Sequence, residues 1–311
     1  MITCVGLSIS FDKIIFLPEL ELDNCNRSDK VSGNLGGKAV NVASVIKQIG
    51  CDPVIVGVVG GRSEEDVKKS LEEKGLAYQL VLQKDVETRI DYIIAEQKTG
   101  RSTMITGPNF QISGGALSEI KEKVMGLAAG SSIMVFTGAL PDGVPKSFFA
   151  ELVLMAKEAG CITIIDSGAQ ELKGSLPARP DFVKPNMQEL SQIVGHMPES
   201  PDEIIAAARS LLDGGAKNAV ISMGAEGAVM VFKEKVLTAR APKIAGRNTI
   251  GCGDAMVAGL ASRLSDGCPA DEAFAYSVAV GAAAAMSEST SSLVTEEINN
   301  LLSKVTVEEI K

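Results

Sequence analysis

Short, almost wholly apolar runs alternate along the chain with segments that have the apolar periodicity of helices. The first pattern is typical of strands buried on both faces, and the second of helices with one apolar face. The expected strands are 2–7, 54–59, 132–137, 161–166, 182–184 and 219–223. The expected helices are 41–49, 63–74, 145–159, 187–194 and 202–213. This alternation predicts an α/β fold in which helices cover both faces of a mostly parallel sheet.

Two regions interrupt the alternation. Residues 12–34 are charged and strand-like, and residues 87–106 have the pattern of a hairpin in which EQKTGRS is the turn and RIDYIIA is one arm. Strand pairs that leave the core in two places could meet in a small separate sheet, which would be a candidate lid. Two solvent-facing hairpins without a role in function explain the pattern equally well.

Composition and charge narrow the class of ligand. The chain has 311 residues, of which 45% are hydrophobic and 22% charged, as in ordinary soluble globular proteins. The net charge of −9 argues against a nucleic-acid-binding surface. A few basic side chains in a cleft can still bind a small anion.

The cysteines and the first residues predict a cytoplasmic protein. The six cysteines include no Cys-x-x-Cys pair, and there is one histidine, so zinc-site spacing is absent and reduced thiols are expected. The stretch MITCVGLSISF lacks the basic and apolar regions of a signal peptide. No apolar run reaches the ~18 residues of a membrane span, so we expect no membrane partner.

The segment NLGGKAVNVASVIKQIG (34–50) is the first candidate binding motif. Gly36 and Gly37 allow a ligand to approach the backbone closely, Lys38 supplies a positive charge, and Asn41 begins a helical pattern. The spacing is not that of a nucleotide P-loop, because Ala39 stands where Ser or Thr would bind magnesium. A purely structural Gly-Gly turn is an equally good explanation.

Arg89, at the start of the strand-like TRIDYII, could bind a phosphate or a carboxylate through its planar guanidinium. A solvated arginine is the commoner explanation. The turn in ISMGAEGAVMV (221–231), with Ser222, Gly224 and Gly227, follows a strand and could line a ligand crevice. A structural hairpin explains this turn nearly as well.

The segment FVKPNMQEL (182–190) combines the end of a strand with the start of a helix. Asn186 and Glu189 are three residues apart, so their oxygen atoms could together hold a hydrated magnesium ion. The same spacing is that of a capping box, in which Asn186 and Glu189 satisfy the helix start. Both explanations stay open.

The segment NTIGCGDAMVAGL (248–260) is the strongest single candidate. Gly251, Cys252, Gly253 and Asp254 precede a helical pattern that runs to Ser265. Glycines at a helix start let a phosphate approach the exposed N–H groups, and Asp254 could accept a proton. Cys252 could have a lowered pKa at this position, and its oxidation could make activity redox-sensitive.

Five motifs occur in the same order as in the PfkB/ribokinase family of carbohydrate kinases, and the chain resembles that family over essentially its whole length. The motifs are GGKAVNVA, TGALPDGV (137–144), VKPNMQEL, SMGAEGA and TIGCGDAMVAGL. Asp12, the Gly-Gly-Lys segment, Arg89 and the GALPDGV loop most resemble the branch that acts on sugar phosphates, which contains 1-phosphofructokinase and tagatose-6-phosphate kinase.

The resemblance implies a ribokinase-like three-layer α/β/α core with a mostly parallel central sheet and a small β-sheet lid. The core would comprise residues 1–11, 35–86 and 107–311, and the lid residues 12–34 and 87–106. Two lids could pair in a homodimer, which the apolar stretch at 14–18 permits. ATP and Mg²⁺ are the implied cofactors, and a monovalent cation is a further candidate.

The resemblance also assigns roles to residues. Asp254 would be the general base, and the amides of Gly251, Cys252, Gly253 and Asp254 would bind the transferring phosphoryl group. The sugar site would comprise Asp12, Gly36, Gly37, Lys38, Asn41, Arg89, Gly138 and Leu140. The nucleotide site would comprise Lys184, Asn186, Ser222, Gly224, Gly227 and Gly281. Asn186 and Glu189 would organise the magnesium ion and its waters.

The implied reaction is transfer of the γ-phosphoryl group of ATP to a phosphorylated ketohexose, with fructose 1-phosphate as the first choice of acceptor. Tagatose 6-phosphate, a nonphosphorylated sugar, a nucleoside and a noncatalytic sugar-binding role stay as alternatives. The sequence departs from the family pattern at four places. These are Ser8, Ala39, the run 103–108 without an acidic residue or asparagine, and a shortened Asp166-Ser167-Gly168.

Overall fold

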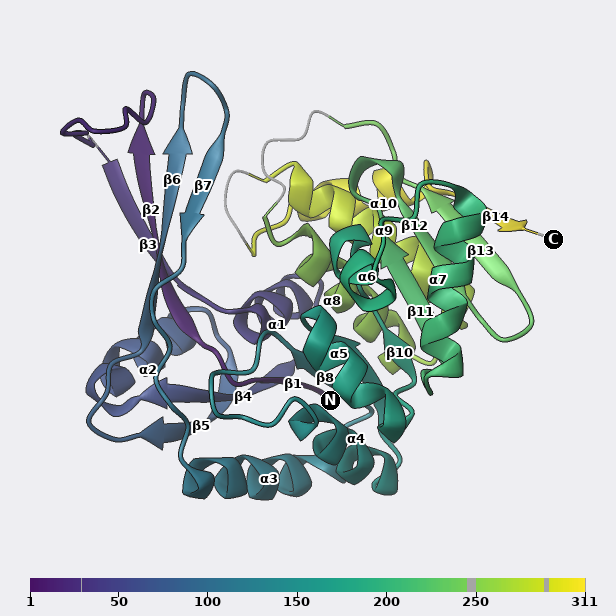
Figure 1. The fold of residues 1–311 in the computed structure, drawn as a ribbon, viewed down its shortest axis with the longest axis horizontal. Coiled ribbons are helices and arrows are strands. Elements are labelled where there is room, and N and C mark those ends of the chain that lie inside the picture. Colours follow the sequence, from purple (N-terminus) through teal and green to yellow (C-terminus); the bar gives the residue numbers. More distant parts are fainter. Residues whose placement is uncertain (29, 245–249, 288–290, 311) are drawn as a thin grey trace.

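The computed structural model describes residues 1–28, 30–244, 250–287 and 291–310. In this part of the chain, ten strands form one sheet in the order β14-β13-β12-β11-β10-β9-β8-β1-β4-β5 (Figure 1). The parallel strands are β1 (Ile2–Gly6), β4 (Pro53–Gly60), β5 (Ala77–Gln83), β8 (Ile133–Thr137), β9 (Ile162–Asp166), β10 (Phe182–Val183) and β11 (Asn218–Ser222). The antiparallel strands at one end are β12 (Ala228–Val231), β13 (Val236–Arg240) and β14 (Thr306–Ile310).

Helices cover both faces of this sheet, because alternate strand residues supply one apolar core on each side. Cys4, for example, lies in one core and Val5 in the other. The first core is closed by α1 (Lys38–Gln48), α2 (Glu64–Glu73), α8 (Cys252–Ser265), α9 (Ala270–Ala285) and α10 (Ile298–Leu302). The second is closed by α3 (Gly114–Ala128), α4 (Phe148–Glu158), α5 (Ala169–Ser175), α6 (Met187–Val194) and α7 (Pro201–Asp213). The predicted layered α/β fold is confirmed.

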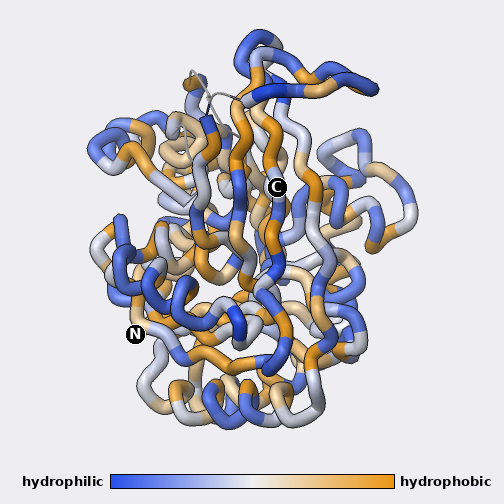
Figure 2. Tube along the Cα trace, turned by 90° about the vertical axis from the view of Figure 1, so that its left-hand side faces the viewer, coloured by the Kyte–Doolittle hydropathy of each residue, from blue (hydrophilic) through white to orange (hydrophobic). Residues whose placement is uncertain are grey.

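A second, smaller sheet has the strand order β3-β2-β6-β7 and projects from the core in Figure 1. Its strands are β2 (Ser10–Leu17), β3 (Lys30–Gly36), β6 (Arg89–Glu96) and β7 (Ser102–Ile105). Ser10 pairs with both Gly36 and Arg89, which joins the two excursions at the core. They therefore form one sheet rather than two separate hairpins, and apolar and polar residues alternate along it (Figure 2). The domain limits 12–34 and 87–106 stay a prediction.

Several elements differ from the sequence-based expectation. The helix expected at 41–49 begins at Lys38, because Gly37 adopts a positive φ of 97° and turns the chain directly into α1. Helices α3, α5, α9 and α10 and strands β5, β13 and β14 were not predicted. Helix α9 lacks a polar face because nearly all of it is buried, so its alanine-rich sequence has no helical periodicity. Within the described residues, no helix is long and apolar enough to span a membrane.

Candidate active site

A cavity of about 940 Å³ lies between the small sheet and the carboxyl edge of the large sheet. Such an edge is where open α/β sheets bind their ligands. The start of α8 lies in the middle of the cavity wall, with the small sheet and α1 at one end and the end of β11, the turn that follows it and α9 at the other (Figure 1). Two ligands could therefore meet at the start of α8.

The start of α8 has the geometry of an anion-binding site. Gly251 adopts a left-handed conformation with φ of 84°, and the next four residues start the helix, with Ala255 N donating to Gly251 O at 2.9 Å. The N–H groups of a first helical turn have no acceptor inside the helix and carry partial positive charge. A Cβ on Gly253 would come within 3.4 Å of Lys184 Nζ, so glycine keeps this turn close to a cation.

Asp254 lies on this first turn and is almost fully buried. Asn41 Nδ2 donates a hydrogen bond of 2.8 Å to Asp254 Oδ2. Burial raises the pKa of Asp254 to about 6, and the charge of Asp166 adds to the effect, whereas Lys38, Asn41 and Lys184 oppose it. The carboxylate is therefore ionised at neutral pH, yet is more basic than an ordinary aspartate, which suits a general base.

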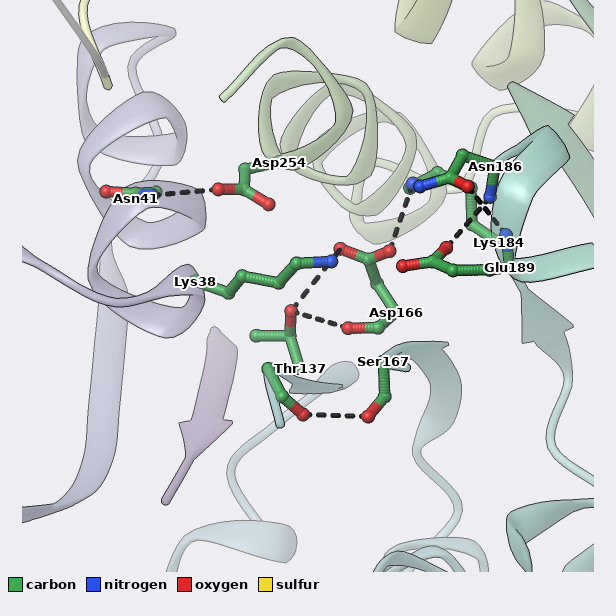
Figure 3. A network of polar contacts seen from close by, with 10 residues as sticks. Lys38, Asn41, Thr137, Asp166, Ser167, Lys184, Asn186, Glu189 and Asp254 are labelled. Carbon is green, nitrogen blue, oxygen red and sulfur yellow. Dashed lines mark hydrogen bonds and ion pairs between the residues drawn. The ribbon is translucent and has the colours of Figure 1, made fainter. Parts of the chain in front are cut away.

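Asp166 is fully buried and pairs with two lysines at the end of β9 (Figure 3). Lys38 Nζ donates to Oδ2 at 3.1 Å, and Lys184 Nζ forms an ion pair with Oδ1 at 3.0 Å. Burial alone would raise the pKa of Asp166, but the two lysines outweigh it and lower the pKa. Burial by itself would lower the pKa of Lys38, but the negative charge of Asp166 and, to a smaller extent, that of Asp254 raise it. The two lysines thus lie on either side of one carboxylate.

Three charged side chains of the small sheet, Asp12, Arg89 and Asp91, line one end of the cavity. This end is called the acceptor end below. Arg89 Nη2 lies 2.9 Å from Asp91 Oδ2, and Arg89 Nη1 donates to Asn109 Oδ1 at 3.3 Å. Ser10 Oγ donates to Asp12 Oδ1 at 2.8 Å, while burial raises the pKa of Asp12. A Cβ on Gly36 would overlap the Asp12 carboxyl group, so this glycine leaves room for that side chain.

The opposite end of the cavity is mostly apolar, with polar groups at one side. The polar side chains here are Lys184, Asn186, Ser222 and Lys243. Gly224 and Gly227 turn the chain with φ of 61° and 101°. A Cβ on Gly227 would overlap the carbonyl of Ala239, so the turn requires glycine. The apolar wall is formed by Ala241, Ile244, Val278, Gly281, Ala282 and Ala285. A flat aromatic base with attached phosphates fits this combination.

Asn186 and Glu189 form the capping box that was left open as an alternative. Asn186 Oδ1 accepts from Glu189 N at 2.8 Å, and Glu189 Oε2 accepts from Asn186 N at 2.9 Å. Glu189 Oε1 still has lone pairs for a hydrated cation. No cluster of three or more acidic, cysteine or histidine side chains occurs among the described residues. These residues fit a magnesium ion that keeps most of its water and binds mainly to nucleotide phosphates.

Cys252 lies in the cavity wall beside Asp254. Burial, followed by the charge of Asp254, raises the pKa of the Cys252 thiol to about 11. The expectation of a lowered pKa was therefore wrong, because burial and a neighbouring carboxylate outweigh the helix terminus. The thiolate that peroxide attacks is scarce at neutral pH, which weakens the hypothesis of redox sensitivity.

Most residues proposed from the sequence line this cavity, but four do not. Gly138 lies behind Lys38, and Leu140 is buried in the second core. Gly36 lies against the Asp12 carboxyl group, and Glu189 caps α6 without lining the cavity. The polar or charged neighbours that sequence reasoning missed are Ser10, Asp91, Asn109, Asp166 and Ser291. Asp91 could have been found, because residues i and i+2 of a strand face the same side.

The sequence of this chain is similar to those of known proteins. The sequence profile described as pfkB family carbohydrate kinase matches residues 1–297. The chain belongs to the pfkB family of carbohydrate kinases. This kinase is 31% identical to 1-phosphofructokinase of Bacillus subtilis over 308 residues, which cover 99% of each chain. It is 28% identical to tagatose-6-phosphate kinase of Staphylococcus epidermidis over 313 residues, covering 100% of each chain.

A solved structure is also similar to this pfkB-family kinase. Phosphofructokinase-2 from Escherichia coli in complex with potassium matches it with a TM-score of 0.91, 26% identity and 98% coverage of each chain. The same Escherichia coli protein has also been solved in a tetrameric inhibited form. The chain is thus a phosphotransferase that acts on a sugar hydroxyl, which confirms the prediction of an enzyme.

Proposed function

We propose that this kinase transfers the γ-phosphoryl group of ATP to a hydroxyl of a phosphorylated ketohexose, with fructose 1-phosphate as the first candidate and fructose 1,6-bisphosphate as its product. The observation that carries the proposal is the single cavity in which the start of α8, with Asp254, separates a charged end from a mostly apolar end. The names of the relatives support a phosphosugar acceptor.

Asp254 would accept the proton of the sugar hydroxyl as that oxygen attacks phosphorus. A base with a pKa of about 6 is ionised at neutral pH and can still bind the proton when the hydroxyl becomes acidic in the transition state. The amides at the start of α8 and Lys184 would stabilise the negative charge of the transferred group. Phosphoryl transfer depends mainly on such positioning and charge stabilisation.

Asn186 and Glu189 would orient the waters of a magnesium ion that neutralises charge on the nucleotide phosphates. A monovalent cation is a further proposed ligand, because the Escherichia coli relative was solved with potassium. Ser222, Gly224 and Gly227 would contact the nucleotide. We also propose a cytoplasmic location, based on the reduced thiols that the cysteine pattern of the sequence predicts.

Arg89 is the best candidate for the existing phosphate of the acceptor. Its Nε atom is buried and has no hydrogen-bond partner within the described residues, which leaves one donor for a ligand. Replacing Arg89 with methionine should raise the KM for the phosphosugar about 10- to 100-fold, the effect of one charged hydrogen bond. The KM for ATP should change less than about twofold, since Arg89 belongs to the acceptor end.

Steady-state kinetics with each substrate varied in turn measures both constants. The matched control is Arg101→Met, because Arg101 also pairs with a small-sheet carboxylate, Glu96, but lies outside the cavity. An unchanged KM for the phosphosugar in Arg89→Met would contradict a phosphate at this position.

One observation favours a nonphosphorylated sugar as a second candidate. Both acceptor-end cations are already paired, Arg89 with Asp91 and Lys38 with Asp166. Met104 and Ile93 add apolar surface at this end. Measuring ATP consumption with fructose 1-phosphate, tagatose 6-phosphate, fructose 6-phosphate, fructose, ribose and adenosine separates the two. Higher kcat/KM for fructose or ribose than for every phosphosugar would reject the first proposal.

We also propose that two copies pair through the outer face of the small sheet. The register places Val31, Tyr92 and Ile105 on the face opposite Asp12 and Asp91. These three apolar side chains are 60%, 37% and 53% exposed, an unusual grouping for a surface that faces water. The tetrameric form of a solved relative supports self-association.

Replacing Tyr92 with glutamate should halve the mass measured by light scattering, because a charge cannot be buried unpaired between two sheets. Leu154→Glu is the matched control, since Leu154 is 52% exposed on α4, away from the small sheet. A wild-type protein that is a monomer at every concentration tested would reject this pairing.

A further inference from the structure

Asn41 is held at both ends of its side-chain amide. Its Nδ2 donates to Asp254 Oδ2 at 2.8 Å, and its Oδ1 accepts from the hydroxyl of Ser291. Asn41 is buried, with 8% of the residue exposed. A flipped amide would point its oxygen at the carboxylate and lose the hydrogen bond to Asp254, so only the observed orientation satisfies this carboxylate, and in that orientation the Ser291 hydroxyl acts as the donor to Asn41.

Ser291 is itself fixed against α1. Gln48 Nε2 donates to Ser291 O at 2.7 Å, and Leu293 N donates to Gln48 Oε1 at 3.0 Å. Asn41 and Gln48 are seven residues apart, so both side chains project from the same face of α1. The segment 291–293 is therefore bound along α1 through two side-chain amides, one of which contacts Asp254.

The hydrogen bond from Asn41 also leaves only one Asp254 oxygen available. Figure 3 shows the Asn41 amide beside one oxygen of Asp254, with the second carboxylate oxygen turned away from Asn41. The charged groups whose fields act on Asp254 are Lys38 on α1, Asp166 at the end of β9 and Lys184 after β10. Cys252, on the same helical turn, is a neutral thiol. Asn41 is the neutral donor in this set, and it fixes orientation as well as charge.

We propose that Asn41 and Ser291 are positioning residues for Asp254: the Ser291 hydroxyl orients the amide, and the amide holds one carboxylate oxygen so that the other faces the acceptor hydroxyl. This inference rests on the proposed role of Asp254 as the base. The sugar contact that the family resemblance assigns to Asn41 stays a separate prediction, since Asn41 also lines the cavity.

Ser291→Ala and Ser291→Gly test the role of the hydroxyl. Ser291 has a positive φ of 61°, which glycine tolerates better than alanine. Loss of the hydroxyl predicts the same result in both variants, whereas a backbone effect would separate them. We expect kcat to fall about 3- to 10-fold, the effect of one hydrogen bond. Both KM values should stay within about twofold, because the amide acts through the base.

Asn41→Asp is the stronger test, because it places a second carboxylate against Asp254. The charged form of Asp254 becomes less favourable, so its pKa should rise by at least about one unit. Turnover requires the ionised base, and the acid limb of the kcat–pH profile should therefore move to higher pH. Ser303→Ala is the control, since the Ser303 hydroxyl donates to the exposed Asn300 carbonyl, away from Asp254.

A second readout does not need turnover. Carbon-13 NMR of the aspartate carboxyl groups, with Asp254→Asn to assign the signal, gives the pKa of Asp254 directly. We expect an upward shift in Ser291→Ala, in Ser291→Gly and, more strongly, in Asn41→Asp. Unchanged pKa values, or a raised sugar KM with normal kcat, would overturn the inference. If the wild-type protein phosphorylated no sugar, the proposed function would fail while the NMR titration still decided this point.

Discussion

Replacing Asp254 with asparagine is expected to lower kcat by about 10²–10⁴-fold, the usual contribution of a positioned general base. Asparagine keeps the shape of the side chain and still accepts the hydrogen bond from Asn41, so the geometry of the cavity should persist. The KM for ATP should change little. Measurement of kcat between pH 5 and 9 checks the prediction, since the wild type should lose activity below about pH 6, where Asp254 becomes protonated.

The same substitution should make the folded protein more stable, which separates loss of chemistry from loss of structure. The pKa of Asp254 is raised on folding from 3.8 to about 6, so the ionised carboxylate destabilises the folded state above pH 6. A shift of about two units corresponds to at most about 3 kcal/mol that asparagine would relieve. A lower melting temperature of Asp254→Asn at pH 8, or near-normal turnover, would contradict the assigned role.

Replacing Asp166 with asparagine is expected to destabilise the fold by about 3–5 kcal/mol, because it leaves the buried Lys184 and the partly exposed Lys38 without their counterion. Lys184 is 4% exposed and Asp166 fully buried, so water replaces little of the lost interaction. The lowered pKa of Asp166 means that its stabilising charge is present above pH 3.8 and is lost only as the pH falls through the lower folded value. Urea unfolding at neutral pH measures the effect.

Asp52→Asn is the control for this experiment. Asp52 also pairs with a lysine, Lys47, at 2.7 Å, but its side chain is 91% exposed. Solvent screens an exposed pair, so this variant should unfold like the wild type. Equal stabilities of the Asp166→Asn and wild-type proteins would show that the two lysines do not depend on the buried carboxylate.

The sequence was sufficient to predict those structural elements that depend on the pattern of neighbouring residues. The expected strands and most helices were found because apolar runs and helical periodicity report burial directly. The glycines around Asp254 and in the turn after β11 also have local causes, a left-handed conformation or a close backbone approach. The capping box was foreseen as an alternative because its spacing alone defines it.

The contacts that connect distant segments were not predictable in this way. Asp166 pairs with Lys38, 128 residues earlier, and Asn41 bonds to Asp254, 213 residues later. Neither partner can be inferred from the spacing within one motif. The pKa of Cys252 was misjudged for the same reason, because its burial depends on packing rather than on the neighbouring sequence.

The central claim is that this pfkB-family kinase phosphorylates a phosphosugar with Asp254 as the base. Its most direct test is phosphorus-31 NMR of purified protein incubated with ATP, Mg²⁺ and fructose 1-phosphate, compared with Asp254→Asn. The account predicts a new phosphomonoester signal, that of fructose 1,6-bisphosphate, in the wild type and about 10²–10⁴-fold slower formation in the variant. Equal rates in the two proteins, or product only with unphosphorylated fructose, would contradict it.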